Sequence, residues 1–199
     1  MDKCLNFKTY TNMKATVEEY LLKFDRKDVL QHLFNVIDEL EFIKKTYGYV
    51  EKESYCACLL HDIGKAIKDE MAVEFCLKHD IEMLEIEKKV PAILHQKTSE
   101  YIAKNTFKVT NEIVLDAIRH HTTLKANPSR CNIELFIADK MSFKDNEYIE
   151  VADKMKYYLK VSKELAIFTY LKELHEKQND LNIYHPQTHE AYLYFKKLL

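Results

Sequence analysis

Glycine and proline are so scarce in this chain that few folds other than helical ones are open to it. The 199 residues include only two glycines, Gly48 and Gly64, and three prolines. Hairpin turns and phosphate-cradling loops both depend on clustered glycines, and the sequence contains no such cluster. The sequence therefore predicts an all-α fold.

The spacing of apolar residues agrees with that prediction. The clearest stripe begins near Asp28, ends near Gly48 and recurs at three and four residues, as one face of a helix does, through Val29, Leu33, Val36, Ile37 and Leu40. Other helix starts are predicted at the Thr16-x-x-Glu19 capping box, at Pro91 and at Asn132. The stretch 146–178 predicts one broken helix or two consecutive ones. We expect a single domain of roughly eight or more helices.

Charge and cysteine count narrow the classes of function. Thirty Lys and Arg against 32 Asp and Glu give a net charge of −2, which offers no broad positive surface to nucleic acid. No apolar run approaches the roughly 18 to 20 residues that span a bilayer, and the first residues lack the apolar core of a signal peptide. We expect a cytoplasmic protein without nucleic-acid or membrane partners. Five cysteines, an odd number, fit reduced thiols, and Cys56-x-Cys58 is interpreted as packing rather than a metal site.

The pair His61-Asp62, within LLHDIGK, is the first strong functional signal. Two good metal ligands stand among buried-type residues, and polar groups in an apolar setting need partners. Imidazole nitrogen and carboxylate oxygen suit iron, manganese, zinc or cobalt, and a carboxylate can bridge two ions. Alone the dipeptide is weak evidence, because such pairs arise by chance.

Neighbouring predicted helices each add one candidate ligand on the apolar face. The spacing of three or four residues from an apolar neighbour directs these side chains inward. A single inward histidine is more often a core residue that is satisfied by hydrogen bonds, but convergence of the whole set predicts a metal centre. The candidate metal ligands are His32, His61, Asp62, His95, His121 and Asp139.

The other histidines are predicted to have different roles. His120 diverges from His121 by about 100° on a helix, so it is expected to support the ligands or face the substrate. His185 precedes Pro186 and is expected to begin a helix. Surface or capping positions are predicted for this residue and for three others, which are His79, His175 and His189.

The order H…HD…H…H…D resembles the HD-domain phosphohydrolases with a binuclear metal site. The segments LLHDIGK, AIRHHTT, IADK and IYHPQTHEAY resemble the YqeK-type symmetrical diadenosine tetraphosphate hydrolases, and the likeness runs from about Asp28 to the C-terminus. The resemblance implies a helical bundle of the HD-domain type over residues 1–199. Its metal-binding core would span about 28–145, with helices over about 146–199 packing on it.

By the same resemblance, two divalent ions share Asp62 as a bridge. One ion would be held by His32, His61, Asp62 and Asp139, and the other by Asp62, His95 and His121. Iron is the expected metal, with manganese or cobalt as alternatives. The implied reaction is hydrolysis of diadenosine tetraphosphate to two ADP by metal-activated water.

Several polar residues near these ligands are candidates for contact with substrate phosphates. Lys65 follows His61 by four residues, so Asp62 and Lys65 are the predicted catalytic residues. Substrate contacts are predicted for Lys65, Arg119, His120, Thr122, Thr123 and Lys140, because charged and hydroxyl groups suit that role.

Two departures from the family pattern bear on the substrate. Leu124 stands where the family has a small residue, and Met141–Lys144 replaces a segment that carries a proline and an arginine. The alternatives are therefore a nucleoside monophosphate or an alarmone as substrate, or a nucleotide-binding protein without catalysis. A homodimer is a further possibility, through the helices that carry Tyr157, Tyr158, Phe168 and Tyr170; the alternative is that these aromatics pack on the chain's own core.

Overall fold

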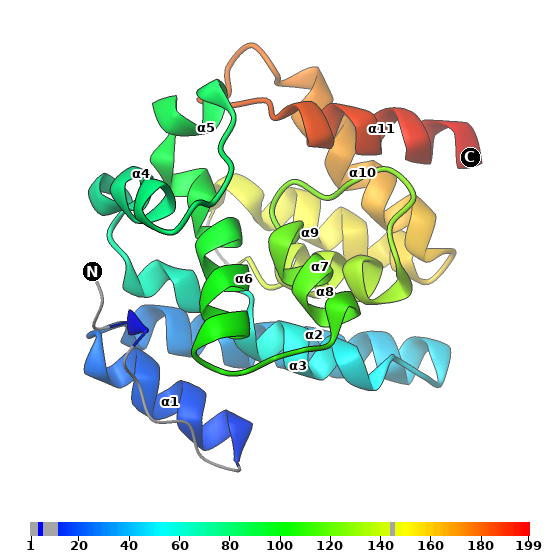
Figure 1. Ribbon diagram of the computed structural model, residues 1–199. Coiled ribbons are helices and arrows are strands. Elements are labelled where there is room, and N and C mark those ends of the chain that lie inside the picture. The colour runs from blue at the N-terminus through cyan, green and yellow to red at the C-terminus, as the bar shows by residue number, and fades with distance from the viewer. Residues whose placement is uncertain (1–3, 6–11, 144–145) are drawn as a thin grey trace.

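The computed structural model describes residues 4–5, 12–143 and 146–199, and its regular structure is entirely helical (Figure 1). No strand occurs in these parts of the chain, so the predicted all-α fold is confirmed. The α-helices are α1 (Met13–Lys23), α2 (Lys27–Tyr47), α3 (Lys52–Leu60), α4 (Asp69–Lys78), α5 (Glu85–Lys89), α6 (His95–Asn105), α7 (Glu112–Arg119), α8 (Arg130–Met141), α9 (Asn146–Leu159), α10 (Lys163–Glu176) and α11 (Pro186–Leu198). Two 3₁₀ turns are η2 (Ile63–Ala66) and η3 (Pro91–Leu94).

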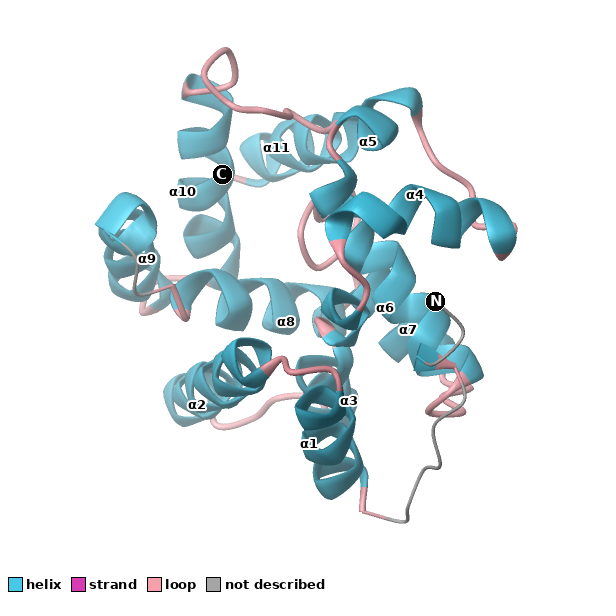
Figure 2. Cartoon of the chain, turned by 90° about the vertical axis from the view of Figure 1, so that its left-hand side faces the viewer, coloured by secondary structure: helices cyan, strands magenta, loops and turns pink. Residues whose placement is uncertain are grey.

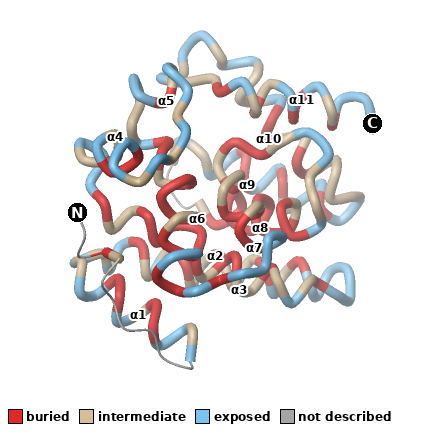
Figure 3. The backbone as a smooth tube through the Cα atoms, in the orientation of Figure 1, coloured by how far each residue is buried: buried red, intermediate tan, exposed pale blue. Residues whose placement is uncertain are grey.

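Helix α8 runs through the middle of the molecule. It packs against α2, α3, α7, α9 and α10, and every residue of it except Arg130 and Ile133 is buried (Figure 2). The buried backbone in Figure 3 follows α8 and the neighbouring stretches of α6 and α7, whereas outer turns are exposed. A helix that is buried on all sides carries its polar side chains into the core, where each needs a hydrogen-bond or ion-pair partner.

Some helix boundaries follow the sequence signals and others do not. Gly48 ends α2 in the left-handed conformation, with φ of 78°, and Pro91 opens η3, both as predicted. The predicted capping box at Thr16 is wrong, because α1 begins earlier, at an Asn12 cap, and Thr16 Oγ1 donates to the carbonyl of Asn12. The predicted start at Asn132 is also wrong. Ser129 caps α8, and Asn132 completes that capping box from inside the helix.

The stretch 146–178 forms two consecutive helices, α9 and α10, as one of the two predictions had it. Tyr170 lies edge-on to Phe136 of α8, and Phe168 stacks on Tyr192 of α11, so these two aromatics pack on their own chain. Tyr157 is 67% exposed. The single-domain organisation and the homodimer stay predictions.

The described helices include none that is both long and apolar enough to cross a bilayer. The cytoplasmic location stays a prediction. All five cysteines are free, and four of them are buried. Burial raises the pKa of the Cys76 thiol to about 11, which fits the predicted role of inert packing residues.

Candidate metal centre

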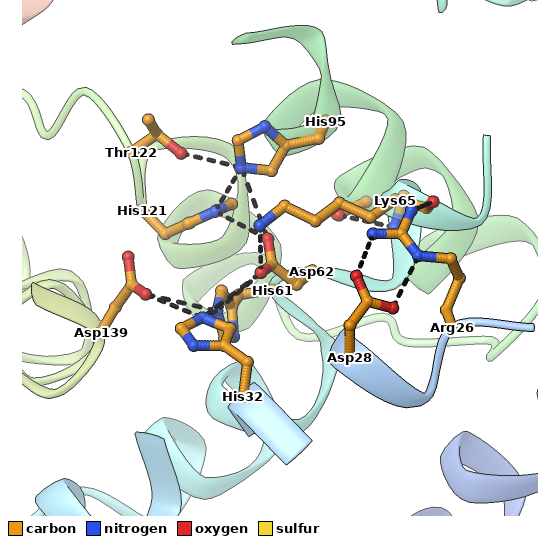
Figure 4. A network of polar contacts seen from close by, with 12 residues as sticks. Arg26, Asp28, His32, His61, Asp62, Lys65, His95, His121, Thr122 and Asp139 are labelled. Atoms are coloured by element: carbon orange, nitrogen blue, oxygen red, sulfur yellow. Dashed lines mark hydrogen bonds and ion pairs between the residues drawn. The ribbon is translucent and has the colours of Figure 1, made fainter. Parts of the chain in front are cut away.

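The structure brings all six predicted ligands into one cluster, although they come from five separate segments (Figure 4). They lie within α2, at the α3–η2 junction, at the first residue of α6, just after α7, and within α8: His32, His61, Asp62, His95, His121 and Asp139. Only His32 and His95 have side chains more than a tenth exposed. The cluster is therefore a largely buried site, partly exposed at His32 and His95.

Asp62 lies between two pairs of histidines and turns one oxygen to each. Its Oδ2 is 3.4 Å from Nε2 of His32 and 3.6 Å from Nε2 of His61. Its Oδ1 is 3.4 Å from Nε2 of both His95 and His121. A carboxylate in this position can bridge two ions.

Each histidine pair closes one half of the cluster. The Nε2 atoms of His32 and His61 are 3.2 Å apart, and Oδ1 of Asp139 lies 3.1 Å and 3.7 Å from them. The Nε2 atoms of His95 and His121 are 3.0 Å apart. Two groupings of ligand atoms that lie within 4.8 Å of one another are His32, His61, Asp139 and His61, Asp62, His121. Counting Asp62 in both halves, four of the predicted ligands lie in one half of the cluster and three in the other.

The tautomer of three of these imidazoles is fixed by the backbone. Nδ1 of His61, His95 and His121 lies 2.9, 2.6 and 2.7 Å from the carbonyls of Cys58, Ala92 and Ile118. A carbonyl only accepts, so each Nδ1 carries the hydrogen and each Nε2 presents a lone pair to the cluster. This arrangement orients a histidine as a metal ligand.

The charges of the cluster agree with metal ligation. Burial lowers the pKa of His95 to about 3 and also lowers that of His121, so both rings are neutral. Burial opposes ionisation of Asp62, but the charges of His61 and Lys65 outweigh it and hold its pKa well below the usual range. Burial likewise favours neutral His61, yet Asp62 and Asp139 raise its pKa, so a proton and a metal would compete for this ring.

One buried oxygen without a hydrogen-bond partner indicates that the cluster suits a bound cation. Asp62 Oδ1 is buried and has no hydrogen-bond partner among the described residues. It faces the Nε2 lone pairs of His95 and His121, so three acceptors meet here, and the Thr122 hydroxyl can donate only to that of His95. Buried polar groups are rarely left unpaired, and a divalent cation is the partner that such a set of nitrogen and oxygen atoms suits. These residues therefore fit a bound metal.

Gly64 sets the distance between two ligand-bearing segments. Its N–H donates to Ser99 Oγ of α6 at 2.8 Å. A Cβ at this position would meet the backbone nitrogen of Ser99 at 2.5 Å and the carbonyl oxygen of His95 at 2.6 Å. Only glycine allows η2 to lie this close to α6, which places Asp62 beside His95. No sequence pattern predicted this contact.

Three of the predicted substrate-binding residues touch the cluster. Lys65 Nζ lies 2.7 Å from Asp62 Oδ2, and this lysine side chain is 34% exposed. Lys140 Nζ lies 2.7 Å from Asp139 Oδ2 and is buried. Thr122 Oγ1 is 3.0 Å from Nε2 of His95.

The other three predicted contacts are directed elsewhere. Arg119 pairs with Glu100 on α6. His120 Nδ1 lies 3.2 Å from Asp116 Oδ1. Thr123 is buried and binds side chains of α6 and α11. Substrate contacts for Arg119, His120 and Thr123 stay a prediction, and Thr123 also lines a cleft beside the cluster.

Two residues near the cluster were not predicted. Ser142 Oγ donates to the carbonyl of Asp139 at 2.7 Å and lies 3.4 Å from Nδ1 of His32, so it can accept the hydrogen of that ring. In the sequence, Ser142 stood out only as part of the Met141–Lys144 departure, whose last residue lies outside the described residues. Arg26 donates to the carbonyl of Lys65 and pairs with Asp28, which ties η2 to the start of α2.

The remaining histidines lie away from the cluster. His185 caps α11 as predicted, but it is buried rather than at the surface, with Nε2 3.3 Å from Glu87 Oε1. His79 ends α4 as a cap. His175 and His189 are half-buried and both contact the hydroxyl of Tyr184.

A cleft of about 460 Å³ adjoins the cluster. His95, Thr122 and Lys140 form one side of it, and α9, α10 and the segment before α11 supply the other. The aromatic residues of this cleft are Tyr148, Tyr170 and Tyr184. The C-terminal helices therefore shape the approach to the cluster, which their predicted role of packing on the core did not include.

Comparisons with known proteins agree with this geometry. A sequence model of the HD domain matches residues 29–144. An uncharacterised protein in the pepC 5' region of Lactococcus lactis subsp. cremoris is 34% identical over 151 residues, which cover 76% of this chain and 73% of that protein. A symmetrical bis(5'-nucleosyl)-tetraphosphatase of Halalkalibacterium halodurans is 27% identical over 109 residues, 55% of this chain and 58% of that protein.

A solved structure shares the fold. It is described as a predicted HD superfamily hydrolase involved in NAD metabolism from Clostridium acetobutylicum, and it aligns with a TM-score of 0.82 over 98% of this chain and 100% of that one, at 20% identity. At this identity the likeness concerns the fold alone. The matched residues 29–144 include all six residues of the cluster. The chain belongs to the HD domain family.

Proposed function

We propose that this protein is a metal-dependent hydrolase that cleaves diadenosine tetraphosphate symmetrically to two ADP. The observation that carries the proposal is the position of Asp62, whose two oxygens each face a pair of histidine nitrogens. This arrangement suits two bridged cations rather than one. The named relative from Halalkalibacterium halodurans supports the choice of substrate.

Phosphoanhydrides resist hydrolysis because their negative charge repels a nucleophile. Two bound divalent ions would supply positive charge and make water a better nucleophile at neutral pH. The protein's part is to hold the ligands rigidly: backbone carbonyls fix three imidazoles, and Lys140 fixes Asp139. Preorganised charge of this kind lowers the barrier without reorganisation during the reaction.

Lys65 is the residue we propose to contact the reacting phosphates. Its ammonium group is beside Asp62, while a third of its side chain reaches solvent, so it can turn toward a phosphate without leaving the site. Thr122 adds a hydroxyl beside His95 on the cleft side. Charged and neutral donors that converge on one edge of the cluster suit the oxygens of a polyphosphate.

The cleft is the place we propose for one nucleoside end of the substrate. Its volume of about 460 Å³ lies within the roughly 300–1,000 Å³ of small-molecule sites. Tyr148, Tyr170 and Tyr184 line it and offer faces or edges to a base. Lys140 lies where this cleft meets the cluster, so the base and the polyphosphate have separate surroundings.

The proposed reaction needs no covalent intermediate. A water oxygen forms a bond to one of the two inner phosphorus atoms, and the bond from that phosphorus to the central bridging oxygen breaks. The bridging oxygen leaves on the second ADP, and the proton of the water passes to solvent at neutral pH. Each half then carries two phosphates, so ADP is the only product.

The test combines metal analysis with product analysis. Protein purified without oxygen should contain two ions per chain, iron being the metal we propose, and manganese or cobalt should restore activity after metal removal. Diadenosine tetraphosphate should give ADP alone. Asp62→Asn should abolish the reaction, and Asp153→Asn, at an exposed position of α9, should not. Formation of AMP plus ATP, or phosphate release from dAMP without cleavage of diadenosine tetraphosphate, would contradict the proposed substrate.

A further inference from the structure

The turn that presents His121 and Thr122 to the cluster has a strained backbone. Leu124 adopts φ of 57°, a conformation that residues other than glycine rarely take. Its N–H donates to the carbonyl of His120 at 2.8 Å. The side chain of Leu124 is fully buried. A turn of this kind persists only where surrounding contacts hold it in place.

The contacts that hold the turn converge on Thr123. Thr188 Oγ1 donates to the carbonyl of Thr123 at 3.0 Å, and Thr123 Oγ1 donates to Gln187 Oε1 at 3.2 Å. Both partners lie in the first turn of α11, more than sixty residues along the chain. Gln96 of α6 accepts from the N–H of Thr123 at 3.4 Å. Thr123 and Thr188 are buried, so the hydrogen bond between them is shielded from water, whereas the one to half-buried Gln187 is partly shielded.

The first turn of α11 is itself fixed to the core. His185 Nδ1 accepts from the N–H of Gln187, so its Nε2 carries the hydrogen and donates to Glu87 Oε1. The other oxygen of Glu87 binds Lys97 Nζ at 2.5 Å and the N–H of Leu84 at 2.7 Å. Glu87 is fully buried and belongs to α5, the helix that lies beside the start of α11 (Figure 2). The first turn of α11 is therefore held in a defined position by α5.

We propose that Thr188 and Gln187 are positioning residues for one half of the metal centre: through Thr123 they set His121 and Thr122, and thereby the affinity of the ion on the Oδ1 side of Asp62. The inference rests on the proposed two-ion site. It gives the C-terminal helix a role in metal binding, although α11 contributes none of the six ligands.

The opposite half of the centre is held by other contacts. His61 is fixed by the carbonyl of Cys58 in α3, and His32 is adjacent to Ser142 at the end of α8. Loss of the α11 contacts should therefore weaken the binding of one ion and leave the binding of the other unchanged. A general loss of protein stability would weaken the binding of both ions.

The experiment is a calorimetric titration of the metal-free protein with Mn²⁺. The wild-type protein should bind two ions in separable steps, the second on the Oδ1 side of Asp62, where three predicted ligands meet against four on the other side. Thr188→Val keeps the shape of the side chain but removes the donor, and it should weaken the second step by about tenfold or more while leaving the first unchanged. Thr188→Ser keeps the hydroxyl and should restore the second step. Thr169→Val removes a hydroxyl that binds only within α10, and it should match the wild type.

Each outcome of the titration either supports or overturns the inference. If Thr188→Val binds both ions as the wild type does, or weakens both steps equally, the inference is overturned. If Thr188→Val does not fold, Gln187→Met removes the other α11 contact and must weaken the same step. Wild-type protein that binds fewer than two Mn²⁺ would overturn the proposed centre itself, which is a different result from a variant without effect.

Discussion

Lys140 Nζ lies 2.7 Å from Oδ2 of Asp139, and both side chains are only 5% exposed. The other oxygen of Asp139 faces His32 and His61. The carboxylate is thus shared between an ammonium group and one half of the candidate metal centre. Three aromatic rings, those of Phe136, Phe143 and Tyr170, surround the ammonium group.

We expect Lys140→Met to destabilise the metal-free protein far more than the metal-loaded protein. Removal of one partner from a buried ion pair costs about 3–5 kcal/mol, because the remaining charge is left without compensation. A bound cation would compensate Asp139 and reduce that cost. Urea unfolding with a chelator and with excess Mn²⁺ measures both values. Lys172→Met removes an exposed pair with Glu176 and should cost under about 1 kcal/mol in both conditions. Equal losses for Lys140→Met in the two conditions would contradict the prediction.

Lys65→Met should impair catalysis without loss of metal. Lys65 contacts Asp62 from the solvent side and is not among the six ligands. Removal of a single charged donor to a transition state costs about 10²-fold or more in rate. We expect kcat/KM for diadenosine tetraphosphate to fall by about that factor, while elemental analysis still finds two ions. Lys88→Met, at an exposed pair with Glu85, is the matched control. Unchanged kcat/KM in Lys65→Met would remove this residue from the mechanism.

Glu87 makes the fold sensitive to acid. Burial alone would raise its pKa, but hydrogen bonds from His185 and Lys97 outweigh burial and lower the pKa to about 2. The unfolded chain titrates near 4.5, so the stabilisation is complete above that pH and is lost as the pH falls toward 2. The difference corresponds to about 3 kcal/mol.

Glu87→Gln should remove the stabilisation that the ionised carboxylate supplies at neutral pH. The variant should be less stable than the wild type at neutral pH, and the two free energies of unfolding should converge as the pH falls below about 4. Glu85→Gln, at the exposed start of the same helix, should follow the wild type throughout. A constant gap between wild type and Glu87→Gln across this range would show that ionisation of Glu87 is not the cause.

The apolar stripes of α2 and α8 reported the buried faces that carry His32 and Asp139, so the convergence of these two predicted ligands could be read from sequence. The helical argument did not apply to His121. Helix α7 ends at Arg119, so the angle of 100° per residue no longer applies to His120, His121 and Thr122. The turn that follows, which includes the positive φ of Leu124, directs both His121 and Thr122 to the cluster.

Lys140 and Gly64 illustrate two other limits. Helix α8 is buried on nearly every side, so periodicity does not separate an inward Asp139 from an inward Lys140. The role of Gly64 depends on the approach of α6, thirty residues later, and no local pattern reports such an approach. Contacts that join distant segments thus needed the structure.

Leu124 should reverse the usual order of alanine and glycine. Leu124→Ala leaves a cavity at a cost of about 2–5 kcal/mol and keeps the strained backbone. Leu124→Gly leaves the same cavity but relieves about 1 kcal/mol of strain, so it should be the more stable of the two. At Leu135, equally buried within α8, glycine should be worse than alanine by about 1 kcal/mol. Denaturant unfolding of the four variants tests this, and the same order at both positions would contradict it.

The two glycines of the chain should differ in their effect on the metal centre. Gly64→Ala forces a Cβ against the backbone of Ser99 and His95, so η2 and α6 must separate and Asp62 must move away from His95. We expect the ion on the Oδ1 side of Asp62 to be lost. Gly48→Ala meets no atom within 4 Å but strains the left-handed end of α2, so it should cost about 1 kcal/mol and leave both ions bound. Metal content after dialysis, measured together with the free energy of unfolding, separates the two effects. Two tightly bound ions in Gly64→Ala would mean that the close packing of η2 on α6 does not position the metal ligands.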